Sequence, residues 1–121
     1  MLVAYDVALE LIRALRPVVA QLKAHSSAAA DQVERAASSI VLNLAEGDRR
    51  QGRDRKRFFD MAHGSAGEIR GALELADAWG WEVGTAQARA LLDRELGLLW
   101  GLTRRSRDHV TAERSSRPKI R

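Results

Sequence analysis

The sequence predicts an all-α protein, an antiparallel up-down four-helix bundle. Apolar residues recur at spacings of three and four in four segments, the pattern of helices that each bury one face. Valine, isoleucine and threonine never alternate with polar residues over a strand length, so no sheet is expected. Short connections favour antiparallel neighbours in one bundle. Residues 1–110 are expected to form this domain, and residues 111–121 a basic, disordered tail.

The first two helices are separated by a polar break. Pro17 lacks an amide donor and is expected to bend or divide the first helix. The run His25-Ser26-Ser27 supplies capping candidates for the second helix, and Gly47 is the expected stop at its C-terminus. The predicted inner face of the first helix is Tyr5, Ala8, Ile12, Leu15, Val19 and Leu22, and that of the second is Val33, Ala37, Ile40 and Leu44.

The third helix is expected to open at Gly52 or Asp54 and to end at Gly80. Trp79 is expected to pack inward, and the fourth helix to follow Gly84-Thr85 and to fray near His109. The inner face of the third helix is predicted as Phe58, Ala62, Ser65, Ile69, Leu73 and Ala76, with Phe59 on its flank. That of the fourth is Ala88, Leu92, Leu96, Leu99 and Leu102 or Thr103.

The net charge of +4 is unevenly distributed. Residues 48–57 carry six basic and two acidic side chains, and residues 103–121 carry seven and two. A local basic surface on an acidic body is typical of proteins that bind nucleic-acid phosphates or another anionic surface. The plain alternative is a solvated loop followed by a disordered tail.

The candidate nucleic-acid-binding residues belong to these two segments. In an up-down bundle, the second connection and the end of the fourth helix lie at the same end. Arginine binds phosphate with two parallel hydrogen bonds, and the loop itself contains no aromatic residue, so phosphate contacts are expected rather than base reading. The candidates are Arg49, Arg50, Arg53, Arg55, Lys56, Arg57, Arg104, Arg105 and Arg107.

Candidates for enzymatic chemistry are few. Cysteine is absent, and no histidine belongs to the Glu-x-x-His pairs of di-iron bundles. The histidines are His25, His63 and His109. Glu46 and Glu68 are weighed as an acid–base pair, but a structural role is preferred, in which they accept hydrogen bonds from a helix end, from Asn43 or from an arginine such as Arg57. No enzyme activity, cofactor or metal is expected.

Glycines within the predicted helices raise the question of helix association, because each costs about 1 kcal/mol relative to alanine. They indicate close approach inside the bundle or between subunits, unless they only reflect a composition rich in small residues. Trp81 or Trp100, if exposed, is expected to anchor a partner subunit or to stack on an unpaired base. The glycines are Gly64, Gly67, Gly71, Gly97 and Gly101.

The expected location is the cytoplasm. No uncharged apolar run approaches the ~20 residues of a membrane span. Met1-Leu2-Val3 leads into a segment carrying Asp6 and Glu10, which is unlike a signal peptide. A chain without cysteine also suits a reducing compartment.

Residues of the second and third helices resemble a known family. The run Ser39-Ile40-Val41-Leu42-Asn43-Leu44-Ala45-Glu46-Gly47, followed by Arg57-Phe58, Ala62, Gly64-Ser65 and Glu68, is similar to the 23S rRNA intervening-sequence proteins. Gln32, Arg35, Ala36 and Ser38 extend the similarity upstream, and the helix order agrees over about residues 2–108. Val41-Leu42 replaces a step that often contains proline, and the basic tail has no counterpart.

The resemblance implies a four-helix bundle that assembles into a ring-like homopentamer, encoded in bacteria within insertions of the large ribosomal RNA gene. It implies no catalytic residues, and Asn43, Glu46, Gly47, Ser65 and Glu68 are interpreted as structural or assembly positions. A related branch, the accessory proteins of diversity-generating retroelements, implies a basic pentamer that engages a reverse transcriptase and nucleic acid.

The preferred hypothesis is a non-enzymatic homo-oligomer whose basic end binds structured RNA or other nucleic acid. The alternative is a protein-interaction scaffold, or an accessory subunit of an enzyme such as a reverse transcriptase, that does not itself contact nucleic acid. Charge reversal at Arg49, Arg50 and Arg53 separates the two, because it spares a hydrophobic partner. A third reading, a hydrolase using Glu46 or Glu68, requires a polar pocket between the second and third helices.

Overall fold

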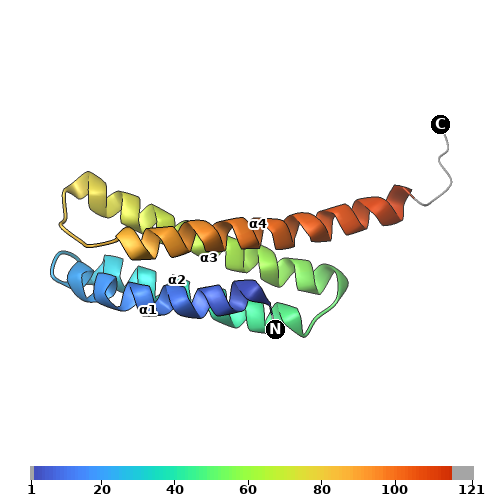
Figure 1. Ribbon diagram of the computed structural model, residues 1–121, viewed down its shortest axis with the longest axis horizontal. Coiled ribbons are helices and arrows are strands. Elements are labelled where there is room, and N and C mark those ends of the chain that lie inside the picture. Colours follow the sequence, from blue (N-terminus) through green and yellow to red (C-terminus); the bar gives the residue numbers. More distant parts are fainter. Residues whose placement is uncertain (1, 116–121) are drawn as a thin grey trace.

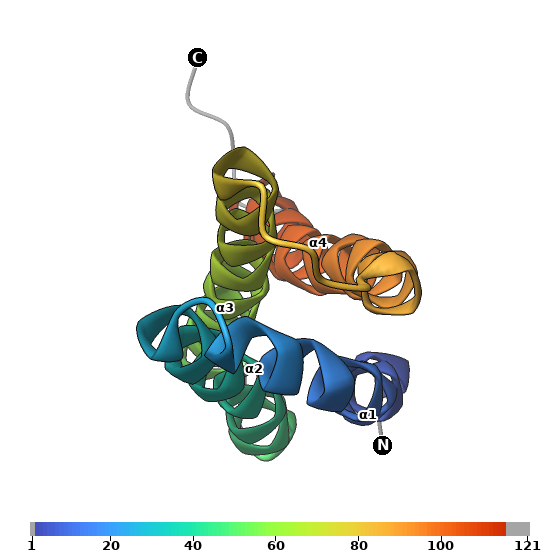
Figure 2. The same ribbon diagram turned by 90° about the vertical axis from the view of Figure 1, so that its left-hand side faces the viewer.

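The computed structural model describes the fold of residues 2–115 and the side chains of residues 2–104. Successive helices run antiparallel, and the described residues contain no strand (Figure 1). Seen from one end, each helix packs against two others: α1 and α3 both contact α2 and α4 (Figure 2). The predicted four-helix bundle is confirmed. Its helices are α1 (Val3–Lys23), α2 (Ser27–Asp48), α3 (Gly52–Trp79) and α4 (Ala86–Ser115).

The core is built from the faces that the spacing predicts, with local rotations. All four predicted inner residues of α2 are buried. In α1, Tyr5, Ile12 and Val19 are only half-buried, because the centre of the face includes Leu11 and Val18. In α4 up to residue 104, the buried residues are Ala88, Leu92, Glu95, Leu99 and Thr103, whereas Leu96 and Leu102 lie at the margin.

Two helix boundaries follow the predicted capping chemistry. The Ser26 hydroxyl accepts a hydrogen bond from the Ala29 amide (3.1 Å), which satisfies one of the free donors at the start of α2. Gly80 ends α3 with φ 76°, a left-handed conformation that side chains with a Cβ disfavour. Both sites therefore have the roles that the sequence indicates.

Pro17 does not divide α1, which continues to Lys23. The proline ring is exposed, and it removes only the amide that would bond to the carbonyl of Arg13. Val18 and Leu22, beyond the proline, are fully buried in the core. Their packing keeps the last turns of the helix in place.

The role predicted for Gly47 as the stop of α2 is wrong. The helix continues to Asp48, and Gly47 does not have a positive φ. A Cβ at Gly47 would lie 2.7 Å from Cε1 of Phe59 and 3.1 Å from Cβ of Phe58. Phe59 is buried and Phe58 is half-buried, which reverses the predicted order of core and flank. Glycine is needed here for space, because α3 crosses directly over it.

We expect Gly47→Ala to destabilise the protein by about 1–3 kcal/mol, because the buried Phe59 ring must shift to admit the methyl group. Gly67→Ala is the matched control, since nothing lies within 4 Å of a Cβ at that helix position. Its greater helix propensity predicts a gain of up to about 1 kcal/mol. Urea unfolding followed by circular dichroism measures both. An equal response of the two variants would contradict the assignment of close packing to Gly47.

The outer face of α3 differs from the prediction. Trp79 is 68% exposed rather than packed inward, because it shares a stripe with the exposed Leu75 one turn earlier. Nothing lies within 4 Å of a Cβ at Gly64, Gly67, Gly71 or Gly97. These four glycines therefore do not serve to let two helices of the bundle approach closely. The remaining explanations for them are contact between subunits or a composition rich in small residues.

α4 continues to Ser115, past His109 where the sequence predicts fraying, so residues 111–115 of the predicted tail are helical. Residues 116–121 lie outside the described part of the chain. Among the described residues, no helix has the length and apolar character needed to cross a membrane.

Candidate nucleic-acid interface

The cationic residues of 48–57 lie where α2 ends and α3 begins, at one end of the bundle (Figure 1). α4 passes the same end but on a different side of the molecule, as Figures 1 and 2 together show. Arg104 of α4 is exposed. Arg105 and Arg107 lie outside the residues whose side chains are described. The α2–α3 connection therefore supplies the described core of the site.

Arg55 caps the C-terminal end of α2. Its Nη1 donates to the carbonyl oxygens of Gly47 (3.2 Å) and Asp48 (3.3 Å), and its guanidinium carbon lies 4.8 Å from the centroid of the Phe59 ring. The Gly47 carbonyl also accepts from the Arg50 amide (3.1 Å), so Arg55 adds a second donor there. At the Asp48 carbonyl it supplies a side-chain donor, in the last turn where helix carbonyls lack intrahelical partners. Arg55 thus has a structural role that the sequence reading, which grouped it with the phosphate contacts, did not show.

Lys56 is also held within the fold. Its half-buried ammonium pairs with Asp60 one turn along α3. Such a spacing of four residues brings the two side chains together on one helix face. Lys56 therefore offers less charge to solvent than its sequence position suggests.

Arg49 and Arg50 share one carboxylate. Their guanidinium nitrogens lie 3.4 and 2.8 Å from the oxygens of Glu46. The hydrogen bond from Arg50 is the main cause of the lowered pKa of Glu46, followed by desolvation, which opposes it, and by the charges of both arginines. One carboxylate does not neutralise two arginines, so this turn remains cationic.

Phe58 lies among the arginines. The guanidinium carbons of Arg50 and Arg57 are 5.7 and 5.0 Å from its ring centroid, distances at which a cation is attracted to an aromatic face. Arg57 also lies 4.0 Å from Asp54. The sequence reading assigned Phe58 to the core and so missed this aromatic support. We call the exposed residues Arg49, Arg50, Arg53 and Arg57 the arginine face.

The model of one protein family, the 23S rRNA-intervening sequence proteins, matches residues 1–91. The chain belongs to this family. The similarity recognised in α2 and α3 is therefore confirmed, and the matched range covers residues 49–57. No match was found among curated proteins or among solved structures.

The family motif residues join α2 to α3 through a short polar chain. The Asn43 amide donates to the carbonyl (2.8 Å) and hydroxyl (2.9 Å) of Ser39, one turn back in α2. The link between helices is made by Ser65, whose hydroxyl donates to that of Ser39 (2.9 Å). Ser39 is thus the centre of the chain, a role that its sequence position did not indicate.

The two motif carboxylates have separate partners. Glu46 accepts hydrogen bonds from Arg49 and Arg50, not from Asn43 or Arg57. Glu68 accepts one from the Gln32 side chain of α2 at 3.1 Å. Glu46 thus accepts from arginines, one of the kinds of donor that the sequence predicts, whereas the donor to Glu68 is a residue that the prediction did not name.

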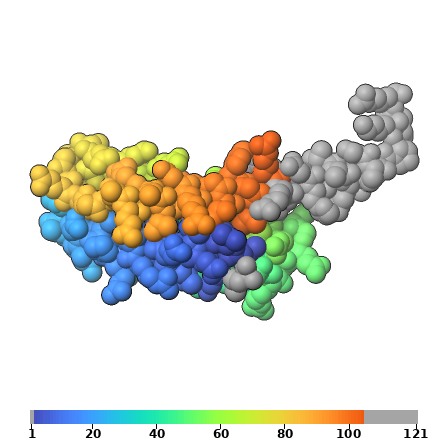
Figure 3. Space-filling view, viewed as in Figure 1, coloured from blue at the N-terminus to red at the C-terminus, as the bar shows by residue number. Residues whose placement is uncertain are grey.

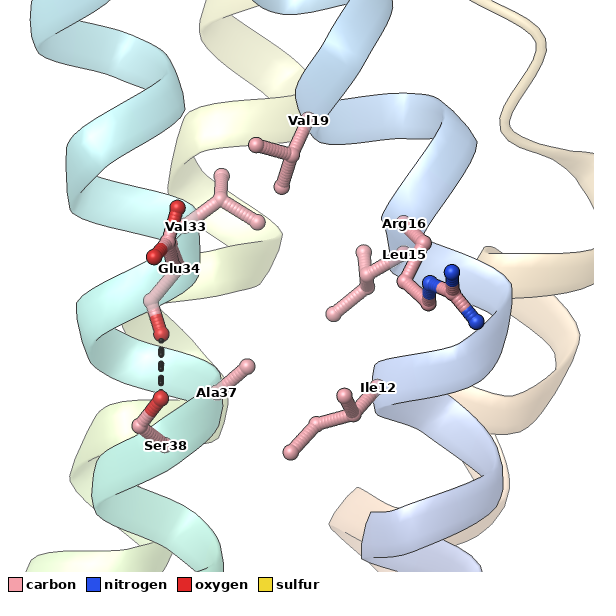
Figure 4. A pocket seen from close by; sticks show the side chains of 8 residues that line it. All are labelled: Ile12, Leu15, Arg16, Val19, Val33, Glu34, Ala37 and Ser38. Carbon is pink, nitrogen blue, oxygen red and sulfur yellow. Dashed lines mark hydrogen bonds between the residues drawn. The ribbon is translucent and has the colours of Figure 1, made fainter.

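A groove that the sequence did not indicate lies between α1 and α2 (Figure 4). Its volume is about 360 Å³, and Figure 4 shows apolar side chains of the two helices facing each other across it. The polar members are Arg16, Glu34 and Ser38, whose hydroxyl donates to the Glu34 carbonyl (2.9 Å). The apolar members are Ile12, Leu15, Val19, Val33 and Ala37.

Proposed function

We propose that this family member is a cytoplasmic, homo-oligomeric and non-enzymatic bundle that binds structured RNA or another nucleic acid through its phosphates. The observation that supports this most is the arginine face, in which Arg50 and Arg57 are held over the Phe58 ring. The family's name, which refers to 23S rRNA, points to the same class of ligand.

The ion pairs within the arginine face are of a kind that a phosphate can replace. The side chains of Arg49 and Arg57 are 76% and 65% exposed, and ion pairs at such sites contribute about 0–1 kcal/mol. A phosphate can therefore replace Glu46 or Asp54 as a partner at little cost. Support by the Phe58 ring limits the motion of two guanidiniums, which reduces the entropy lost on binding.

Self-association is proposed on the outer stripe of α3, which we define as Met61, Gly64, Gly71, Leu75 and Trp79. Three of these residues are exposed large apolar side chains, and the two glycines leave open space between them. Exposed apolar surface with small residues suits contact with another helix. A ring-like pentamer, as the family resemblance implies, repeats a weak arginine face several times and so raises its avidity.

The second candidate is a protein-interaction scaffold, or an accessory subunit of an enzyme such as a reverse transcriptase. It is favoured by an aromatic stack at the opposite end of the bundle. The ring centroid of Trp81 lies 5.6 Å from that of His25 and 6.5 Å from that of Trp79, with nearly parallel planes. Exposed tryptophan is common at the centres of protein interfaces.

Neutralising Arg49 and Arg53 together, each to glutamine, is expected to weaken nucleic-acid binding and to reduce its salt dependence. Each lost phosphate contact lowers the slope of log affinity against log salt by about 0.9 for duplex and 0.7 for single strands. Fluorescent structured RNA, duplex DNA and single strands are titrated across a salt series, with mass measured in the same buffer by light scattering. Arg13→Gln with Arg35→Gln is the matched control, since both residues are exposed and the change in net charge is identical.

Equal losses in the two double variants would show that total charge, not the arginine face, governs binding. A wild-type oligomer that fails to bind at low salt would remove the nucleic-acid proposal. A protein partner that is retained by the arginine variants and lost with Trp79→Ala would favour the scaffold.

A further inference from the structure

Glu95 is a carboxylic acid inside the core of the bundle. Its exposed fraction is 0%, and neither carboxyl oxygen has a hydrogen-bond partner within the described protein. Among the described side chains, the other two buried polar residues are both bonded: Ser65 to Ser39, and Thr103 to the Trp100 carbonyl. Burying a charged group without a partner is strongly unfavourable. The fold therefore contains one acidic group whose ionisation opposes the packing around it.

The position of Glu95 follows from the contacts between helices. Arg89 of α4 bonds Asp77 of α3 (2.7 Å), and Arg70 of α3 lies 3.9 Å from Asp93 of α4. This antiparallel register places Glu95 level with residues 68–71 of α3, in the middle of the bundle. Figure 3 shows the surfaces of α1 and α4 meeting along one face of the bundle.

Charged neighbours do not compensate the carboxyl. Burial is the main influence on Glu95 and raises its pKa to about 8, while the charge of Arg94 acts weakly in the opposite direction. His63, beside Trp100, and Tyr5 of α1 are half-buried, and the other titratable groups near this level on α1, α3 and α4 are exposed. These exposed groups are Asp6, Glu10 and Arg13 on α1, Glu68 and Arg70 on α3, and Asp93 and Arg94 on α4.

We propose that Glu95 is a proton-dependent latch that holds the second half of α4 in the bundle when neutral and releases it when ionised. Beyond Glu95, this half is anchored in the core by Leu99 and Thr103. Gly97 and Gly101 lower its helix propensity relative to alanine. Helices are only about 10–12 Å in diameter, so displacement of one helix is enough to bring the carboxyl to water.

The latch is inferred without the proposed nucleic-acid function, and Glu95 lies outside the residues that the family model matches. The family match ends at residue 91, before Glu95. The segment that the latch controls carries the exposed Trp100 and Arg104. Release of this segment therefore changes the surface that this part of α4 presents.

Amide hydrogen exchange of the wild-type protein between pH 5 and pH 9, corrected for the intrinsic pH dependence of exchange, tests the latch. Opening in peptides covering residues 95–104 is expected to rise about 10- to 30-fold from pH 6.5 to pH 9 and to level off above pH 8. Peptides of α2 are expected to keep their protection. Glu95→Gln should remove the rise, whereas Glu10→Gln, at an exposed glutamate, should preserve it.

Equal pH profiles in wild type and Glu95→Gln would overturn the latch, as would loss of protection in α2 and α4 together. A second measurement needs no variant: carboxyl-carbon NMR of glutamate-labelled wild-type protein. A Glu95 midpoint in the ordinary range below pH 6 would overturn the proposal, and a midpoint near 8 that coincides with the end of the exchange rise supports it.

Discussion

Phe59→Ala is expected to destabilise the bundle by about 3–5 kcal/mol, enough to unfold a marginally stable domain. The ring is 1% exposed, lies against Gly47 of α2 and carries the Arg55 guanidinium on its face. Its removal leaves a cavity and also loosens the arginine that caps α2. Urea unfolding monitored by circular dichroism measures the loss.

Phe58→Ala is the matched control for this prediction. The Phe58 ring is half-buried and supports Arg50 and Arg57, so its removal is expected to cost about 1 kcal/mol of stability. Weaker nucleic-acid binding is its main expected effect. A larger stability loss for Phe58→Ala than for Phe59→Ala would restore the order of core and flank that the sequence predicts.

These two residues show how far periodicity determines the core. Phe58 precedes Ala62 by four positions and Phe59 precedes it by three, so both fit the spacing of a helix face. What separates them is Gly47 on another helix, whose missing side chain makes room for the Phe59 ring. The helices were predictable because their pattern is local, whereas this choice depends on a contact between helices.

For the glycines and for Trp79, too, the sequence pattern did not decide what each residue does in the fold. Gly80 and Gly47 both follow apolar helical patterns, but the first is required by its backbone conformation and the second by space. Trp79 is apolar enough for a core, yet its turn of α3 faces outward with Leu75. The sequence shows where such residues lie, but it does not show whether backbone conformation, available space or exposure to solvent determines each of them.

The charge pattern located the candidate site, but it did not show which of the basic residues have structural roles. Counting residues cannot show that Arg55 caps α2 or that Lys56 pairs with Asp60, because these contacts depend on side-chain geometry. Glu95 did leave a signal in the sequence. It lies three residues after Leu92 and four before Leu99, on the inner stripe, where the prediction chose the neighbouring Leu96 instead.

The free energy of unfolding is expected to fall as the pH rises from 4.5 to 8, by roughly 3–5 kcal/mol, because of Glu95. Its ordinary pKa is 4.5, and burial raises it to about 8 in the folded protein. Between these values the folded state binds the proton and the unfolded state does not, so each rise in pH favours unfolding. The stabilisation is complete below pH 4.5 and is lost by about pH 8. Urea unfolding at intervals of one pH unit measures the slope.

Substitutions at Glu95 separate the effect of the carboxyl charge from the effect of the packing of the side chain. Glu95→Gln is expected to flatten the stability profile between pH 5 and pH 8, and Glu95→Leu to raise stability at pH 8 by about 1–4 kcal/mol, as replacement of buried charge by apolar groups often does. Glu10→Gln is expected to retain the wild-type slope. An unchanged slope in Glu95→Gln would show that the carboxyl is not buried as described. If the slope depends on Glu95 but α4 does not open locally, the carboxyl ionises only when the whole protein unfolds. That result would support the buried acid and would reject the latch.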